Sequence, residues 1–211
     1  MKGTSTEKRL ASQFICKFYK DFPTLQELAV NSLFDLCEDE EVEIRKQVIK
    51  DLPSICKDHQ ENVPKITDIL CQLLDTDDQT EIQIIHLSLI SLCKISPKHF
   101  LTGLFAQIEN NDEIIKERAI QFLHNKIKTL PEDFWSKENE EFFLNESKKI
   151  LVDSSRERFS ILMTILSNLK ICKRISGQQV LLDMVNQNLH LELDINVSAT
   201  GPAILVFKWA A

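Results

Sequence analysis

The sequence contains few residues that interrupt helices or form tight turns. Only 4 of its 211 residues are glycine and 6 are proline. The apolar residues are mostly leucine and isoleucine at spacings of three and four, which is typical of amphipathic helices and not of alternating strands. With 43% apolar residues, the chain has enough hydrophobic side chains to bury a core. We therefore predict an all-α fold.

The sequence also lacks the marks of a membrane-spanning, secreted or disulfide-linked protein. No apolar run approaches the roughly 20 residues that a membrane span requires. The N-terminal stretch MKGTSTEKR is polar, unlike a signal peptide. The six cysteines, at positions 16, 37, 56, 71, 93 and 172, include no closely spaced pair. We expect reduced core thiols in an intracellular protein that makes no membrane contact.

Motifs of enzymes, cofactor sites and metal sites are missing as well. There is no GxGxxG, Walker A, GxSxG or HExxH motif, and the five histidines are scattered. The acidic stretches 38–41 and 75–81 lack the alternating ligands and central glycine of a calcium loop. We predict no enzymatic activity, no cofactor and no metal. The net charge of −7 disfavours direct nucleic-acid binding and favours a basic partner.

Amphipathic segments follow one another along most of the chain. Apolar stripes predict helices over 24–36, 44–56, 63–74, 82–93, 115–127, 142–151, 159–169 and 180–189. Pro53 should kink the second of them. Connections of only a few residues require antiparallel neighbours.

One helical motif returns at intervals of about one helix pair. It reads IRxxVxxxL at 44–52 and IKxxAxxxL at 115–123, with weaker copies that begin at Glu7 and Ile84. The four starts, 7, 44, 84 and 115, are 37, 40 and 31 residues apart. This spacing is typical of HEAT repeats. We predict a right-handed α-α superhelix, a HEAT and armadillo-like solenoid of about ten helices.

Acidic runs recur with the same period. They begin at Glu38, Asp75 and Asp112, with a sparser one near Asp153 and Glu157, so the steps are 37, 37 and 41 residues. Two interpretations stay open. The acids either cap the following helices and complement their dipoles, with Glu41 placed to pair with Arg45 four residues later, or they form a negative ridge for a basic protein. Under the second interpretation the candidate partner-binding residues are Glu38, Asp39, Asp75, Asp77, Asp78, Glu113, Asp153 and Glu157.

Several stretches resemble the N-terminal half of the apoptosis inhibitor 5 family. They include EKRLASQFICKFYKDFP at 7–23, LCEDEEVEIRKQVIKDLP at 36–53 and ERAIQFLHNKIKTLPEDF at 117–134, and the match extends over about 2–193. The resemblance implies a nuclear, non-enzymatic protein-binding scaffold that suppresses programmed cell death. It also implies Acinus and fibroblast growth factor 2 as protein partners. The alternative is a generic HEAT adaptor, such as a nuclear transport or phosphatase scaffold.

Both ends of the chain depart from the family pattern. We expect a HEAT-like domain over 1–193 and a divergent, poorly ordered tail over 194–211, where the helical period is lost. The family begins about one helix pair earlier and has a basic nuclear localisation signal further on, so a cytoplasmic location is the alternative for this chain. Terminal repeats lack a neighbour to cover them. Leu10, Phe14, Phe18, Leu181 and Val185 should therefore be partly exposed.

Overall fold

The computed structural model describes residues 3–110, 113–126, 130, 132–151 and 154–189. All regular secondary structure in these ranges is helical, which confirms the all-α class. The contacts divide the chain into unit 1, Met1–Phe134, and unit 2, Trp135–Ala211. The predicted boundary at 193/194 and the predicted tail fall outside the described residues. The right-handed twist of a superhelix through both units stays a prediction.

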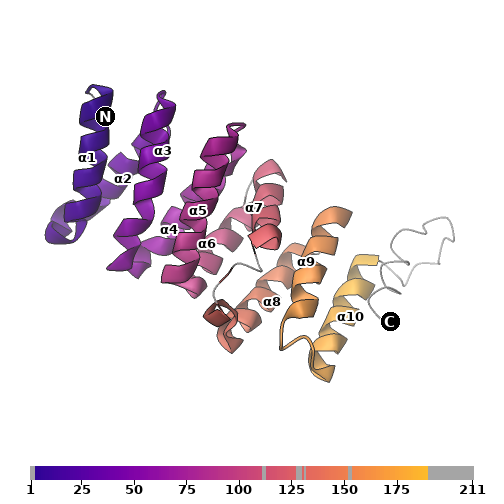
Figure 1. Cartoon of the computed structure of the whole chain (residues 1–211). Helices are drawn as coiled ribbons and strands as arrows, with labels where there is room; N and C mark the ends of the chain where they lie inside the picture. The colour runs from indigo at the N-terminus through magenta and orange to yellow at the C-terminus, as the bar shows by residue number, and fades with distance from the viewer. Residues whose placement is uncertain (1–2, 111–112, 127–129, 131, 152–153, 190–211) are drawn as a thin grey trace. The chain divides into compact units, whose positions relative to one another are not determined.

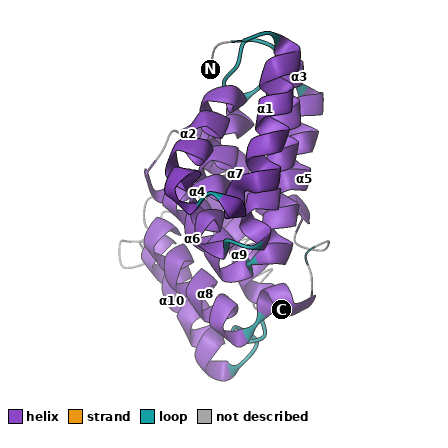
Figure 2. Ribbon diagram, turned by 90° about the vertical axis from the view of Figure 1, so that its left-hand side faces the viewer, coloured by secondary structure: helices purple, strands orange, loops and turns teal. Residues whose placement is uncertain are grey.

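Unit 1 consists of two layers of stacked helices (Figures 1 and 2). Helices α1, α3 and α5 lie side by side, while α2, α4 and α6 form the other layer, and α7 packs against α4 and α6. The four copies of the predicted motif begin in α1, α3, α5 and α7, so the repeat is confirmed as alternate helices of the stack. The helices are α1 (Ser5–Phe18), α2 (Gln26–Cys37), α3 (Val42–Asp51), α4 (Val63–Gln72), α5 (Gln79–Ile95), α6 (Pro97–Asn110) and α7 (Glu113–Lys126), with 3₁₀ turns η1 (Tyr19–Asp21), η2 (Pro23–Leu25), η3 (Leu52–Lys57), η4 (Gln60–Asn62) and η5 (Leu73–Asp75).

The prediction of one kinked helix through Pro53 is wrong. The α-helix ends at Asp51 and the chain continues as the 3₁₀ helix η3. Proline has no N–H, so it cannot donate to the carbonyl of Ile49 four residues earlier. The Ser88 hydroxyl of α5 donates to that carbonyl instead, at 2.8 Å, and both groups are buried. A side chain of the next repeat thus satisfies the acceptor that the proline leaves open.

Helix α6 was not among the helices predicted from apolar stripes. Its buried side chains, including Phe100, Leu101, Leu104, Phe105 and Ile108, lie on one face, and exposed Lys98, Thr102 and Glu109 lie on the other. The apolar stripe was therefore present in the sequence and was overlooked. At its centre Gly103 lies against the start of α4. A Cβ atom added there would come within 2.9 Å of Pro64 Cα and Thr67 Cβ, so the absence of a side chain lets α4 and α6 approach closely.

Unit 2 contains α8 (Lys137–Leu151), α9 (Arg156–Asn168) and α10 (Ile175–Leu189), which pack against one another. The 3₁₀ turn η7 (Glu132–Trp135) leads into it. Buried Glu140 accepts hydrogen bonds from the backbone N–H groups of Lys170 and Ile171, at 3.0 Å each. This carboxylate holds the connection between α9 and α10 onto α8.

The predictions for terminal residues and for thiols are confirmed. Leu10, Phe14 and Phe18 of α1 are 50%, 49% and 40% exposed, and Leu181 and Val185 of α10 are half-buried. All six cysteines are free, and all but Cys16 are buried. Burial raises the pKa of each thiol, to about 11 at Cys16 and about 12 at Cys56, so the thiols are protonated near neutral pH.

Candidate functional site

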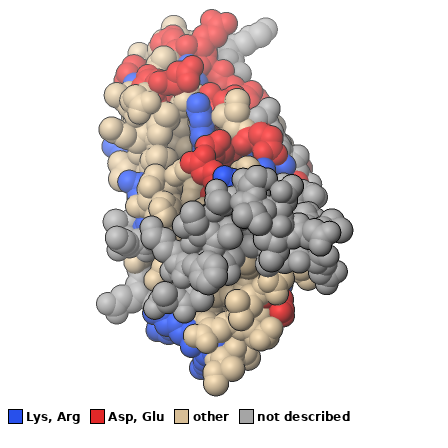
Figure 3. Space-filling view, turned by 90° about the vertical axis from the view of Figure 1, so that its right-hand side faces the viewer, with Lys and Arg blue, Asp and Glu red and all other residues tan. Residues whose placement is uncertain are grey.

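The acidic turns of unit 1 gather at one end of its helices. We call the turns 38–41 and 75–78 the acidic edge; Figure 3 shows the acidic side chains collected at that end. Helices α1, α3 and α5 all begin there (Figure 1). Contacts between neighbouring repeats fix the arrangement. The Ser5 hydroxyl donates to the Glu41 carboxylate, and Lys46 Nζ of α3 lies 3.5 Å from Asp78 Oδ2.

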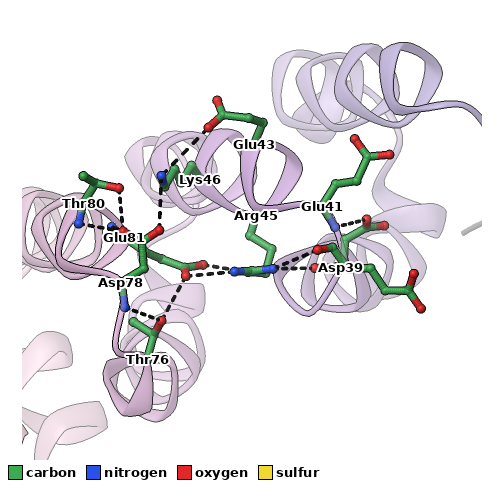
Figure 4. Close-up of polar contacts among 10 residues, drawn as sticks. Asp39, Glu41, Glu43, Arg45, Lys46, Thr76, Asp78, Thr80 and Glu81 are labelled. Atoms are coloured by element: carbon green, nitrogen blue, oxygen red, sulfur yellow. Dashed lines mark hydrogen bonds and ion pairs between the residues drawn. The ribbon is translucent and has the colours of Figure 1, made fainter.

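Arg45 joins the two turns of the acidic edge (Figure 4). Its Nε and Nη2 donate to the two carboxylate oxygens of Glu81 at 2.8 and 3.1 Å. Its Nη1 donates to the backbone carbonyls of Asp39 and Glu40 at 2.9 and 3.3 Å. Glu81 is only 3% exposed and also accepts from the Thr76 hydroxyl at 3.1 Å. The guanidinium therefore neutralises a buried carboxylate and satisfies carbonyls of the preceding turn.

Asp78 acts as a helix cap, as the first interpretation of the acidic runs predicts. Its Oδ1 accepts from the backbone N–H groups of Thr80 and Glu81 at 2.8 and 3.1 Å. The hydrogen bond from the Thr80 side chain, followed by that from the Glu81 backbone, lowers the pKa of Asp78 well below its usual range. Capping does not explain the other turn, because Glu41 is the N-cap residue of α3 but makes no side-chain cap.

Three other acids of the edge, Asp39, Asp75 and Asp77, are paired with a cation from a different helix. Lys8 Nζ lies 2.6 Å from Asp39 Oδ2, and this hydrogen bond is the main reason that the pKa of Asp39 is lowered. Arg118 of α7 donates to the carbonyl of Thr76 at 2.9 Å. The same guanidinium lies 3.9 and 3.7 Å from the carboxylates of Asp75 and Asp77. The edge is therefore held by positioned ion pairs at Asp39, Asp75, Asp77 and Asp78 and is not simply a row of free carboxylates.

The structure brings five of the predicted residues together on unit 1: Glu38, Asp39, Asp75, Asp77 and Asp78. Glu113 begins α7 and lies 3.3 Å from Lys116 Nζ, with 70% of its side chain exposed. Glu157 belongs to the first turn of α9 in unit 2. Asp153 lies outside the described residues. Whether any of these residues binds a partner stays a prediction.

The sequence reasoning missed the basic and buried residues that organise the edge. It expected Arg45 to pair with Glu41, whereas Arg45 binds Glu81. One signal was available, because Glu81 falls on the same helical stripe as the buried residues Ile85 and Leu92, and a charged residue on such a stripe requires a partner. The cation that supplies it comes from the neighbouring repeat.

Two further features bear on the kind of site. Among the described residues, no three His, Cys, Asp or Glu side chains are grouped so as to hold a metal ion. None of the described helices has both the length and the apolar character that crossing a membrane requires.

Comparison with known proteins places the chain beside one family. The family model described as "Apoptosis inhibitory protein 5 (API5)" matches residues 1–202. The human protein named "Apoptosis inhibitor 5" is 48% identical over 198 residues, which are 94% of this chain and 37% of the human one. The Drosophila melanogaster "Apoptosis inhibitor 5 homolog" is 41% identical over 90% of this chain and 36% of its own length. A rice "Apoptosis inhibitor 5-like protein" is 34% identical over 94% of this chain and 38% of its own. The chain thus spans less than two fifths of the length of these relatives.

Proposed function

The chain belongs to the apoptosis inhibitory protein 5 family, and we propose that it is a non-enzymatic scaffold that restrains programmed cell death by binding other proteins. The observation that supports this most directly is the acidic edge of unit 1, where charged turns of successive repeats lie at one end of the helices. The proposed partners are basic proteins. Fibroblast growth factor 2 is one candidate because it is basic, and Acinus is another by family resemblance.

The ion pairs of the edge support this proposal because they position the acids before any partner arrives. Arg45 and Arg118 bind the carbonyls of the turns as well as carboxylates. Asp75 and Asp77 nevertheless keep 61% and 103% of their side-chain surface exposed. A partner therefore meets carboxylates on turns that are already ordered, which lowers the entropy cost of binding.

The expected energy per contact is small. An exposed ion pair contributes at most about 1 kcal/mol, so useful affinity requires several contacts at once. Electrostatic attraction also speeds encounter and weakens with salt, since the Debye length is roughly 10 Å at 0.1 M. Binding should therefore combine a salt-sensitive association rate with dependence on more than one acid.

A charge-reversal experiment tests the proposal. The edge variant carries Glu40→Lys, Asp75→Lys and Asp77→Lys, all at exposed positions of the acidic edge. The control variant carries Asp21→Lys, Glu27→Lys and Asp58→Lys, also exposed but on η1, α2 and the turn after η3. Both variants change the net charge by the same amount. Binding to fibroblast growth factor 2 is measured by surface plasmon resonance at two salt concentrations, and helical content by circular dichroism.

The edge variant should bind at least about tenfold more weakly, which is 1.4 kcal/mol, while the control variant should lose much less. Equal losses in the two variants would show that only net charge matters. If the edge variant binds as tightly as the wild type and its binding does not depend on salt, the acids serve only as helix caps and structural ion pairs. The proposed docking surface would then be wrong.

We also propose a nuclear location, which the family resemblance supports. Imaging of the tagged chain in cells tests this, with a cytoplasmic distribution as the contrary result.

A further inference from the structure

A small surface pocket lies between the C-terminal ends of α2 and α4. Its volume is about 140 Å³. Its lining includes Phe34, Asp35 and Glu38 from α2 and its C-cap, and Ile69, Gln72 and Leu73 from α4 and η5. Cavities of about 150 Å³ hold a benzene-sized group, whereas drug-sized ligands need about 300–1,000 Å³. The pocket is therefore the right size for one side chain of a partner.

The electrostatics of the pocket favour a cation. Helices α2 and α4 both end at it, at Cys37 and Gln72, and helix C-termini carry partial negative charge. The carboxylates of Asp35 and Glu38 add two formal charges at exposed positions. Neither carboxylate has an ion-pair or hydrogen-bond partner among the described residues, unlike Asp39 and Asp78, which already face lysines.

The walls favour a cation on a long apolar stem. Phe34, Ile69 and Leu73 are half-buried and present apolar surface to the pocket. The Phe34 ring already has a cation beside it, because Lys65 Nζ lies 5.2 Å from the ring centroid. Aromatic faces attract such groups, and more often arginine than lysine. Burial, with Glu38 as a lesser cause, raises the pKa of Cys37 to about 12, so this lining residue is a neutral thiol and not a thiolate.

We propose that this pocket holds an arginine side chain of a basic protein partner. The guanidinium lies at Asp35 and Glu38, and the stem and guanidinium plane lie against Phe34 and Leu73. Arginine fits better than lysine because its planar group both stacks on a ring and donates two parallel hydrogen bonds to a carboxylate. This inference rests on the proposed function and specifies one contact of the partner.

The probe is a short capped peptide that alternates glycine and arginine, compared with the same peptide carrying citrulline or lysine in place of arginine. Citrulline keeps the shape of arginine and removes its charge. Binding to the whole chain is followed by NMR chemical shifts of the Cys37 and Leu73 amides. The pocket variant carries Asp35→Asn and Glu38→Gln. The matched control carries Asp21→Asn and Glu27→Gln, two exposed acids outside both the pocket and the acidic edge. A third variant, Gln72→Trp, fills the pocket from an exposed position and keeps both carboxylates.

The arginine peptide should bind to the wild type and shift both amides, the citrulline peptide should not, and the lysine peptide should bind more weakly. The pocket variant and Gln72→Trp should each weaken binding at least about tenfold, while the control stays within about threefold. Equal loss in the control, or unchanged binding by Gln72→Trp, overturns the pocket. Lysine binding as tightly as arginine overturns the stated occupant.

The outcome is separable from that of the proposed function. If the edge variant loses fibroblast growth factor 2 and the pocket variant binds the arginine peptide normally, the pocket is wrong and the acidic edge remains. If the basic protein binds the edge variant as tightly as the wild type but the pocket variant loses the arginine peptide, the docking surface proposed for the edge is wrong and the pocket stands.

Discussion

Replacing Arg45 by alanine should destabilise unit 1 by about 3 kcal/mol, because Glu81 would stay buried without its cation. Breaking a buried ion pair by removing one partner costs about 3–5 kcal/mol. The lower end applies here, since 22% of the Arg45 side chain is exposed and Glu81 keeps its hydrogen bond from Thr76. Arg45→Ala also releases the carbonyls of Asp39 and Glu40, which can bind water at the surface.

The comparison that isolates the pair uses three other variants. Lys46→Ala removes a neighbouring cation whose partners, Glu43 and Asp78, lie 3.9 and 3.5 Å away and are at least one third exposed, so its cost should stay below about 1 kcal/mol. Glu81→Leu alone leaves Arg45 unpaired on a partly exposed site. The double variant Arg45→Leu with Glu81→Leu removes both charges and should be more stable than Arg45→Ala, because apolar pairs of similar volume replace buried ion pairs at little cost.

Hydrogen exchange measured by mass spectrometry suits this test, because it reports the opening of α3 and α5 separately from unit 2. A loss of 3 kcal/mol would speed exchange in these helices by roughly two orders of magnitude where it proceeds through opening of unit 1. If Arg45→Ala and Lys46→Ala changed exchange in α3 and α5 equally, the claim that Arg45 neutralises a buried carboxylate would be refuted.

Three more outcomes follow from the contacts between repeats. Ser88→Ala should lower the free energy of unfolding, measured with urea, by about 1–3 kcal/mol, because the buried Ile49 carbonyl loses its donor. The loss should be smaller in a Pro53→Ala background, where the restored backbone N–H can reach that carbonyl. Gly103→Ala should destabilise the protein by about 1–3 kcal/mol, because the added methyl group crowds Pro64. In a helix with free space at that position, alanine would instead be stabilising. A stabilised variant would therefore show that α4 and α6 can move apart at little cost. The folded-state pKa values of Asp39 and Asp78 are lowered, so the stability that these groups contribute is present above about pH 4 and is lost as pH falls below it. Asp78→Asn keeps a capping side chain but cannot titrate, so its urea midpoint should fall less than that of the wild type between pH 7 and pH 3.

The sequence was sufficient for the fold class and the repeat because both depend on local periodicity. Apolar spacing marks helices whose opposite face is polar. Helix α6 has this pattern too, with exposed Lys98, Thr102 and Glu109 opposite its buried stripe, so its omission was an oversight and not a limit of the sequence. The end of α3 does show such a limit. Pro53 signals an interruption, but the donor that satisfies the open Ile49 carbonyl is Ser88, 39 residues away, and local sequence does not reveal it.

The charges of the candidate site could be located from the sequence, but their partners could not. Sequence reasoning considers neighbours three or four residues away, whereas Arg45 and Glu81 are 36 residues apart and Lys8 and Asp39 are 31 apart. These separations are close to one repeat, because a side chain at a turn of a stacked structure meets the turn of the next repeat. Pairing at that distance removes Asp39 and Asp78 from the set of free acids. It leaves Glu38 together with Asp35, a residue hidden inside the helical pattern of α2, as two carboxylates of the pocket that have no cation partner among the described residues. The sequence alone could not single out this pair, because the lysines that take the neighbouring acids come from other repeats.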